Sequence, residues 1–365
     1  MTVRIICCLV AFCSAGSTFA QQSPMPSSTP KAVASPAAAT PKSLRDLVNQ
    51  LDQAGLQQVI EQLRSNYVDP SALTNEEINQ AAVEGLLSRL GPGATIQTRA
   101  EAERPLRNHP FKSDLIEKQF AYLRLGSFTQ QNLAQLDGAI NDLVDRGATG
   151  LILDLRTMPP GSDFQLAADI LSRFVPKGKV LFNLVQQKDG RERPYTSSAD
   201  PIFTGPIAVL VSSENGGTAE AIAATLRSEI HALIFGQQTS GRAVEYEHYL
   251  VGNGLVLTIA VSKLVIPGSP AVFPKGLAPD IQVSFSKQQQ DSVLALADEK
   301  GLRDYIFDEE RPHTNEAALV AGRNPDLDAY ETGYMSGAAK QRAPKDVALQ
   351  RAIDFLTTIS VFRTK

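Results

Sequence analysis

Short apolar runs alternate with amphipathic stretches through the middle of the chain. Residues 150–155 and 207–211 are continuous apolar runs, as in strands that are buried on both faces. Apolar residues recur at helical spacing in 133–146, 164–174 and 219–226. Because strand and helix patterns alternate, the sequence predicts βαβ units and an α/β fold with a parallel central sheet.

Further strands are predicted around this centre from period-two alternation and β-branched content. They cover residues 119–125, 179–186, 233–235, 244–249 and 255–261. The stretch 94–118 is polar and shows neither period, so it is predicted to be irregular.

Helical patterns predominate toward both ends of the chain. Two helices are predicted over 44–64 and up to Leu90, where Gly91-Pro92-Gly93 stops the second. Residues 287–365 are mostly polar with helical spacing, and Leu349, Ile353 and Leu356 mark a last amphipathic helix. A packing or surface role is expected for this extension.

The first 42 residues have the composition of a leader followed by a tether. Residues 1–20 combine Arg4, an apolar run and small residues before position 20, which is typical of a secretory signal peptide. Residues 21–42 are rich in Pro, Ser, Ala and Thr and are predicted to be a disordered linker. We therefore expect an exported protein, periplasmic or extracellular, without a stable membrane anchor.

The charge and the cysteine content of the chain limit which classes of function it can have. The formal net charge of the 365 residues is −4, with no basic cluster, so nucleic-acid binding is not expected. All three cysteines lie in residues 1–20, and no HExxH or comparable spacing follows. No metal site and no cofactor are predicted.

The polar turn at 212–218 is the strongest candidate for chemistry. It follows a predicted buried strand and opens a helix, so its backbone N–H groups and the helix dipole can hold an anion or an oxyanion. The candidate oxyanion or peptide-binding residues are Gly216, Gly217 and Thr218, with Gly161 in the turn after the neighbouring strand.

Four stretches together resemble the C-terminal processing peptidases, also called tail-specific proteases, a family of serine/lysine peptidases. They are 56–95 with Tyr-Val-Asp-Pro, 150–161 (GLILDLRTMPPG), 207–241, and 275–281 (KGLAPDI). The resemblance implies a crotonase/ClpP-like ββα core with a helical N-terminal piece. We accordingly divide the chain into a helical segment (43–95), an irregular connection (96–118), a tail-specific-protease-like core (119–286) and a helical extension (287–365).

Two departures from the family pattern change what the resemblance implies. The family usually inserts a PDZ domain before the core, whereas only about 25 residues lie between Ile96 and Phe120. The family also carries a Ser-Ala-Ser-Ala-Ser-Glu run, whose middle Ser is the nucleophile, and a Lys base farther on. With the Glu aligned to Glu220, the nucleophile position falls on Gly217, the base on Arg242 and an assisting Gln on Tyr246.

Gly217 and Arg242 cannot perform the roles of nucleophile and base that the family assigns to their positions. Gly217 has no side chain, and Arg242 cannot be deprotonated because the pKa of arginine exceeds about 12. We therefore favour a non-hydrolysing pseudopeptidase that binds a peptide, an unfolded or processed protein, or a partner protein in the old cleft. The alternatives are a serine-type endopeptidase whose nucleophile is displaced to Thr218 or Ser213, and a structural or assembly subunit of undefined oligomeric state.

The other polar residues near the turn are expected to be structural. Glu220 near a helix start is predicted to cap that helix, and Asp154 is predicted to contact Arg156. The four histidines give no Ser-His-Asp arrangement that can be defended from sequence.

Overall fold

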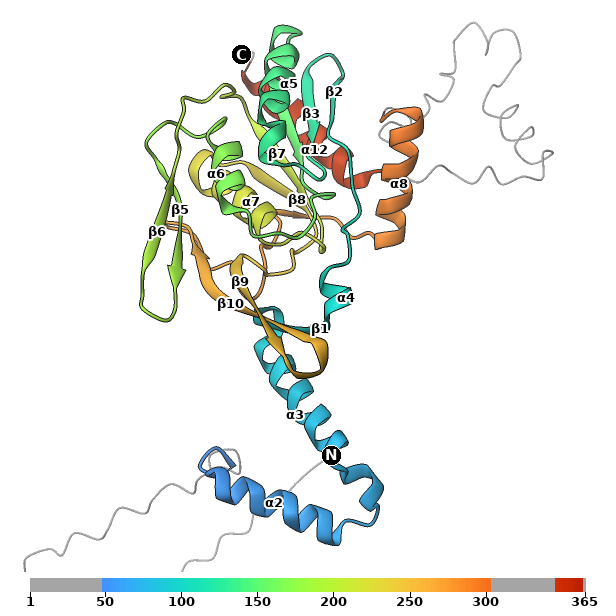
Figure 1. Ribbon diagram of the computed structural model, residues 1–365. Helices are drawn as coiled ribbons and strands as arrows, with labels where there is room; N and C mark the ends of the chain where they lie inside the picture. Colours follow the sequence, from blue (N-terminus) through green and yellow to red (C-terminus); the bar gives the residue numbers. More distant parts are fainter. Residues whose placement is uncertain (1–47, 303–344, 364–365) are drawn as a thin grey trace, which may run out of the picture. The chain divides into compact units, whose positions relative to one another are not determined.

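The computed structural model describes residues 48–302 and 345–363 (Figure 1). The predicted signal peptide, the linker and the central part of the C-terminal extension lie outside these residues. The chain divides into two compact units, residues 1–75 and 76–365.

In the first unit, helix α2 (Gln53–Asn66) begins later than the sequence predicts, because Asp52 caps it by accepting a 2.7 Å hydrogen bond from Gly55 N. The 3₁₀ turn η1 (Pro70–Leu73) follows.

The segment 94–118, predicted to be irregular, contains regular structure, so that prediction was wrong. After helix α3 (Asn75–Leu90) and the turn η2 (Gly91–Gly93) come strand β1 (Ala94–Thr98), helix α4 (Arg99–Ala102) and strand β2 (Lys112–Ile116). β2 pairs with β3 through a tight turn in which Glu117 and Lys118 have positive φ. The sequence signal was missing because such turns usually carry Asn-Gly or Asp-Gly.

A central sheet organises the second unit, as the sequence predicts. Among the described residues it has six strands in the order β11-β8-β7-β4-β3-β2, parallel from β3 to β11. The strands are β3 (Phe120–Arg124), β4 (Gly150–Asp154), β7 (Ile207–Val211), β8 (Leu233–Gly236) and β11 (Ile281–Gln282). Their carboxyl ends meet at one edge, where open α/β sheets place their ligand sites.

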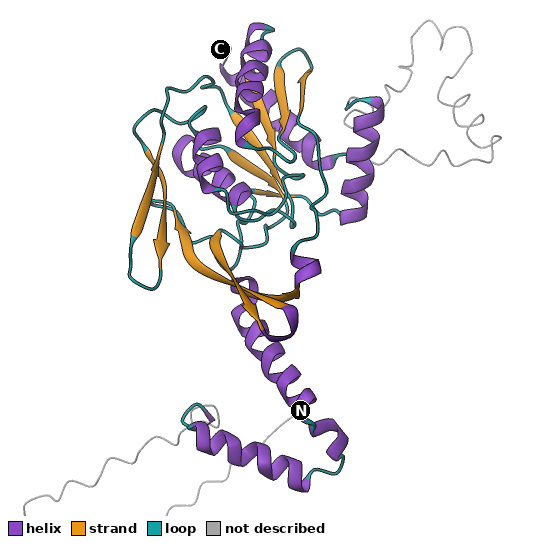
Figure 2. Cartoon of the chain, in the orientation of Figure 1, coloured by secondary structure: helices purple, strands orange, loops and turns teal. Residues whose placement is uncertain are grey.

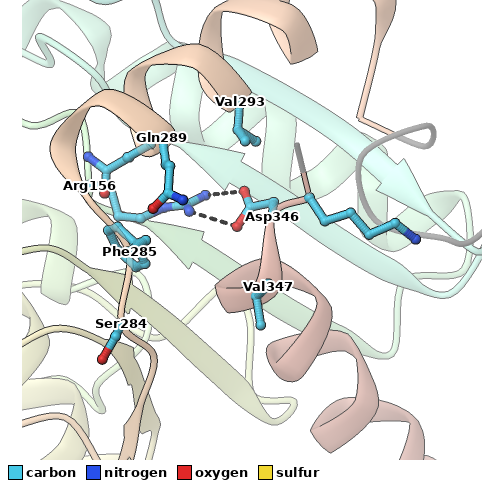
Figure 3. A pocket seen from close by; sticks show the side chains of 9 residues that line it. Arg156, Ser284, Phe285, Gln289, Val293, Asp346 and Val347 are labelled. Atoms are coloured by element: carbon cyan, nitrogen blue, oxygen red, sulfur yellow. Dashed lines mark hydrogen bonds and ion pairs between the residues drawn. The ribbon is translucent and has the colours of Figure 1, made fainter. Parts of the chain in front are cut away.

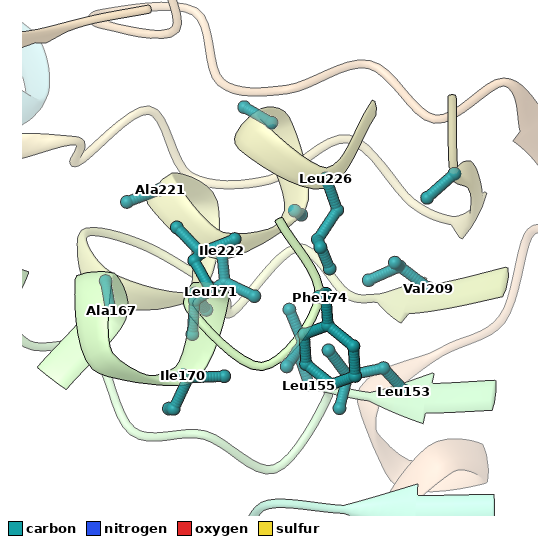
Figure 4. Close-up of a cluster of buried hydrophobic side chains, with 14 of the residues drawn as sticks. Leu153, Leu155, Ala167, Ile170, Leu171, Phe174, Val209, Ala221, Ile222 and Leu226 are labelled. Carbon is teal, nitrogen blue, oxygen red and sulfur yellow. The ribbon is translucent and has the colours of Figure 1, made fainter. Parts of the chain in front are cut away.

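The two faces of this sheet bury alternate residues of each strand. On one face, Leu153 and Val209 pack against α5 (Leu133–Asp145), α6 (Phe164–Leu171) and α7 (Thr218–Ile230), as Figure 4 shows in part. On the other, Ile152 and Leu210 pack against α12 (Val347–Arg363). Burial on both faces explains why these strands read as unbroken apolar runs.

A second sheet contains two further β-hairpins (Figure 2). Among the described residues its strand order is β1-β10-β5-β6, with β9 paired to the other side of β10. The strands are β5 (Val180–Gln186), β6 (Glu192–Thr196), β9 (Val244–Val251) and β10 (Leu255–Val265). Strand β6 was missed because it is largely polar and exposed. Strand β10 was predicted to end four residues early because Ser262 and Lys263 interrupt its apolar run.

The C-terminal extension adds helix α8 (Lys287–Lys300) and α12 to the described structure. The last amphipathic helix is confirmed, since Leu349, Ile353 and Leu356 of α12 are all buried. No helix among the described residues is long and apolar enough to cross a membrane.

Candidate functional site

Asn215 holds the turn after β7 against two neighbouring loops. Its Nδ2 donates to Leu155 O at 2.7 Å, and its Oδ1 accepts from Ser212 N at 2.8 Å. Its backbone oxygen accepts from Ser240 N at 2.9 Å and from Ser240 Oγ at 2.8 Å. Because these partners follow β4, β7 and β8, the side chain and the backbone carbonyl of one buried residue together hold the carboxyl ends of three parallel strands.

The backbone of Gly217 adopts a conformation that a side chain would block. Its φ is +54° and its ψ is −110°, a region that residues with a Cβ rarely adopt. An added Cβ would lie 1.7 Å from Gly161 O, and the two glycines form a parallel β-bridge. The Gly161 carbonyl therefore fills the space into which a nucleophilic side chain at position 217 would project.

Two N–H groups of this turn donate hydrogen bonds within the chain. Thr218 N donates to Gly161 O at 2.9 Å, and Gly217 N donates to Glu220 Oε2 at 3.2 Å. Two donors of the predicted oxyanion site therefore already have acceptors. An incoming carbonyl oxygen could bind Thr218 N only after Gly161 had moved.

The structure brings the aligned position 242 next to the turn. Arg242 lies in the loop after β8, and a Cβ added at Gly217 would be 3.5 Å from Arg242 O. An added Cβ at Gly216 would lie 3.0 Å from Arg242 Cβ. Tyr246, at the third aligned position, instead donates its hydroxyl to Pro92 O at 2.7 Å. Positions 217 and 242, which the alignment with the family assigns to nucleophile and base, therefore lie next to each other in the fold.

The fallback hydroxyls have no base beside them among the described residues. Thr218 is 3% exposed, and its Oγ1 donates to Gly161 O at 3.2 Å and to Asp163 O at 3.3 Å. Ser213 is exposed, and no hydrogen bond joins it to an acid or a base in the described chain. His231 lies at the far end of α7, and His248 Nδ1 pairs with Thr258 Oγ1. No group of three potential metal ligands forms among the described residues.

Glu220 joins the helix start to the loop that carries Arg242, and its predicted capping role is confirmed. Besides Gly217 N, it accepts from Gly241 N at 2.7 Å and from the Thr239 hydroxyl. Burial raises the pKa of Glu220, although hydrogen bonds from Thr239, Gly241 and Gly217 act in the opposite direction.

We expect Glu220 to make this region more stable at mildly acidic pH. Because the pKa of Glu220 is raised on folding, the native state binds its proton first as pH falls. Relative to Glu220→Gln, the wild-type free energy of unfolding should therefore fall as pH rises from about 4.5 through the folded pKa, by up to about 1.4 kcal/mol per pH unit. Urea unfolding of both proteins across this range measures the difference, and a flat difference contradicts the expectation.

The predicted contact between Asp154 and Arg156 is confirmed and is part of a larger buried network. Arg156 Nη2 lies 2.7 Å from Asp154 Oδ2 and 2.7 Å from Asp346 Oδ2, and Tyr122 donates its hydroxyl to Asp154 at 2.8 Å. Figure 3 shows Arg156 facing Asp346 at the start of α12. Burial raises the pKa of Asp154, but the charge and hydrogen bonds of Arg156 outweigh it, so the net pKa is lowered.

Sequence reasoning missed Asp346 and Tyr122 as members of this network. Asp346 precedes a helical pattern, which was a capping signal, and it does accept from Leu349 N at 3.0 Å. Its partner Arg156 lies 190 positions away, a separation that no local pattern reveals.

Comparison with known proteins agrees with the resemblance seen in the sequence. The model of Peptidase family S41 matches residues 119–283. A carboxyl-terminal-processing protease of Synechocystis sp. is 26% identical over 159 residues, which are 44% of this chain and 36% of that protein. The chloroplastic carboxyl-terminal-processing peptidase 1 of Arabidopsis thaliana is 23% identical over 242 residues, 63% and 49% of the two chains. This chain therefore spans about a third to a half of the length of these curated relatives.

Solved structures share the fold of the core. The crystal structure of a candidate peptidase from Parabacteroides merdae ATCC 43184 superimposes with a TM-score of 0.50 at 14% sequence identity, over 66% of this chain and 85% of that one. The predicted α/β core is confirmed. The central sheet and the turn closed by Gly161 and Gly217 lie within residues 119–283, the part of the chain that matches the model of Peptidase family S41 and resembles its C-terminal processing proteases.

Proposed function

We propose that this chain is an exported, non-hydrolysing member of the family that binds a peptide or protein partner. The observation that carries the proposal is the closed turn, where the Gly161 carbonyl fills the space beside Gly217. A serine/lysine peptidase needs an attacking hydroxyl and a neutral amine that takes its proton. Position 217 offers no hydroxyl, and Arg242 stays protonated.

The geometry gives little support to a displaced nucleophile. The Thr218 hydroxyl is buried and donates to two backbone carbonyls, which cannot accept a proton as a base does. The shape of the turn also counts against a vacant oxyanion site, since Gly161 O already accepts from Thr218 N. These features support binding without turnover.

The test is cleavage of unfolded β-casein by the purified chain, monitored by mass spectrometry of the products. We expect no cleavage beyond that of a buffer control. If export removes residues 1–20, the chain recovered from the periplasm of the producing cells should begin at Gln21.

Three variants decide what any cleavage would mean. Products that persist through purification and disappear in Thr218→Ala or Ser213→Ala would overturn the proposal and identify the nucleophile. If a Gly217→Ser, Arg242→Lys double variant cleaves β-casein and the native chain does not, the result would support the proposal and the alignment of both positions.

A further inference from the structure

Strand β9 has an open backbone edge that begins beside the closed turn. Among the described residues β9 pairs only with β10, so its other edge has no strand beside it. The strand starts at Val244, two residues after Arg242, and runs for eight residues. The open edge therefore begins beside Arg242, the position that aligns with the family's Lys base, and runs away from it.

This edge carries neither Lys nor Pro, although β10 has a bulge opposite Glu245 and Tyr246 of β9. Proteins protect exposed edges with Lys, Pro, bulges or very short strands. β6 contains Pro194, β2 begins with Lys112, and β11 has two residues. The sequence of β9, VEYEHYLV, contains neither Lys nor Pro, and its Tyr249 and Leu250 are 45% and 74% exposed.

The two faces of β9 differ in chemistry. Alternate residues share a face, so one face carries Glu245 and Glu247, and Glu247 accepts from the Tyr249 hydroxyl. Glu245 is paired with Arg193 of β6. On this face of β9, Glu247 is therefore the glutamate that has no ion-pair partner among the described residues.

The opposite face of β9 borders a small apolar pocket. His248 and Leu250 line a cavity of about 300 Å³ together with Val256 and Ala102. Arg99 and Glu103 of α4 also line it, but they pair with each other at 2.7 Å, so their charges cancel. A side chain on a neighbouring strand that points to this face would meet a neutral, mostly apolar surface.

We infer that β9 binds an extended segment of a partner protein as an added strand, with Lys or Arg on the Glu247 face and a small apolar residue over the pocket. Backbone hydrogen bonds along the edge would supply affinity, and the alternating side chains would supply selectivity. A second copy of this chain fits less well, because β9 contains no Lys or Arg that could meet Glu247 of the other copy. The inference rests on the proposed function, since it identifies the class of partner that a non-hydrolysing chain would hold.

The probe is a fluorescent octapeptide of four Lys-Val repeats, tested against the full chain by anisotropy and amide hydrogen exchange. A Lys-Pro octapeptide has the same charge but cannot extend a sheet, and a Glu-Val octapeptide has the opposite charge. We expect the Lys-Val peptide to bind about tenfold more tightly than the Lys-Pro peptide, because each backbone hydrogen bond contributes a net stabilisation. It should also bind more tightly than the Glu-Val peptide, because like charges on neighbouring strands are destabilising. It should also slow exchange of the amides in 244–251.

Charge reversal on two exposed strands provides the matched comparison. Glu247→Lys should weaken Lys-Val binding at least about threefold and should improve binding of the Glu-Val peptide. Glu192→Lys on β6 makes the same charge change outside β9, next to the Arg193 that pairs with Glu245, and should leave binding of both peptides unchanged. Equal weakening in both variants, equal binding of the Lys-Pro peptide, or no protection of 244–251 would overturn the inference.

The same samples separate failure of this inference from failure of the proposed function. Mass spectrometry of the Lys-Val peptide after incubation reports hydrolysis independently of binding. An intact peptide without protection at β9 removes the inference alone. A cleaved peptide removes the proposed function, while the exchange pattern still decides whether β9 held it.

Discussion

Replacing Arg156 with methionine is expected to lower the free energy of unfolding by about 3–5 kcal/mol, because a buried ion pair loses one partner. Asp154 and Asp346 are 0% and 5% exposed, and Arg156 is the cation between them. The variant leaves two buried carboxylates with no opposing charge. Urea unfolding at pH 7, followed by circular dichroism, measures the loss.

Arg173 provides the matched control for this experiment. It makes a similar ion pair with Asp137 at 2.8 Å, but the side chains are 17% and 38% exposed. Arg173→Met should therefore cost at most about 1 kcal/mol. A triple variant with Arg156→Met, Asp154→Asn and Asp346→Asn should recover part of the loss. Equal, small effects of the two single variants would show that the network is not a major source of stability.

Replacing Gly217 with alanine is expected to destabilise the chain by at least about 3 kcal/mol, since it combines backbone strain with a steric clash. The backbone there has φ +54°, and the new Cβ would lie 1.7 Å from Gly161 O. Either the β-bridge between the two glycines breaks or the turn changes conformation. The midpoint of urea unfolding reports this effect.

Gly138 is the control glycine in the same unit. It lies within α5, and an added Cβ would meet nothing within 4 Å. Gly138→Ala should stabilise the chain by about 0.5–1 kcal/mol because alanine is the better helix former. If Gly217→Ala were as harmless as Gly138→Ala, the closed turn would not be a fixed feature of the native chain.

The sequence predicted the central sheet because burial on both faces leaves a local signature, as in the unbroken apolar run 207–211. The juxtaposition of positions 217 and 242 was also predicted, from spacing relative to the family. The closure of the turn was not predictable, because the Gly161 carbonyl reaches Gly217 across 56 positions by a backbone contact without a side-chain pattern. Strand β1 was missed because its partner, β10, lies more than 150 residues farther along the chain.

Helix α12 has a consequence for the synthesis of this protein. The helix comes from residues 347–363, and its Leu349, Ile353 and Leu356 cover one apolar face of the central sheet. A ribosome makes α12 after every strand of the central sheet, so a sheet that forms from those strands presents that face uncovered until α12 follows. The order of residues along the chain thus delays completion of the core until α12 has been made.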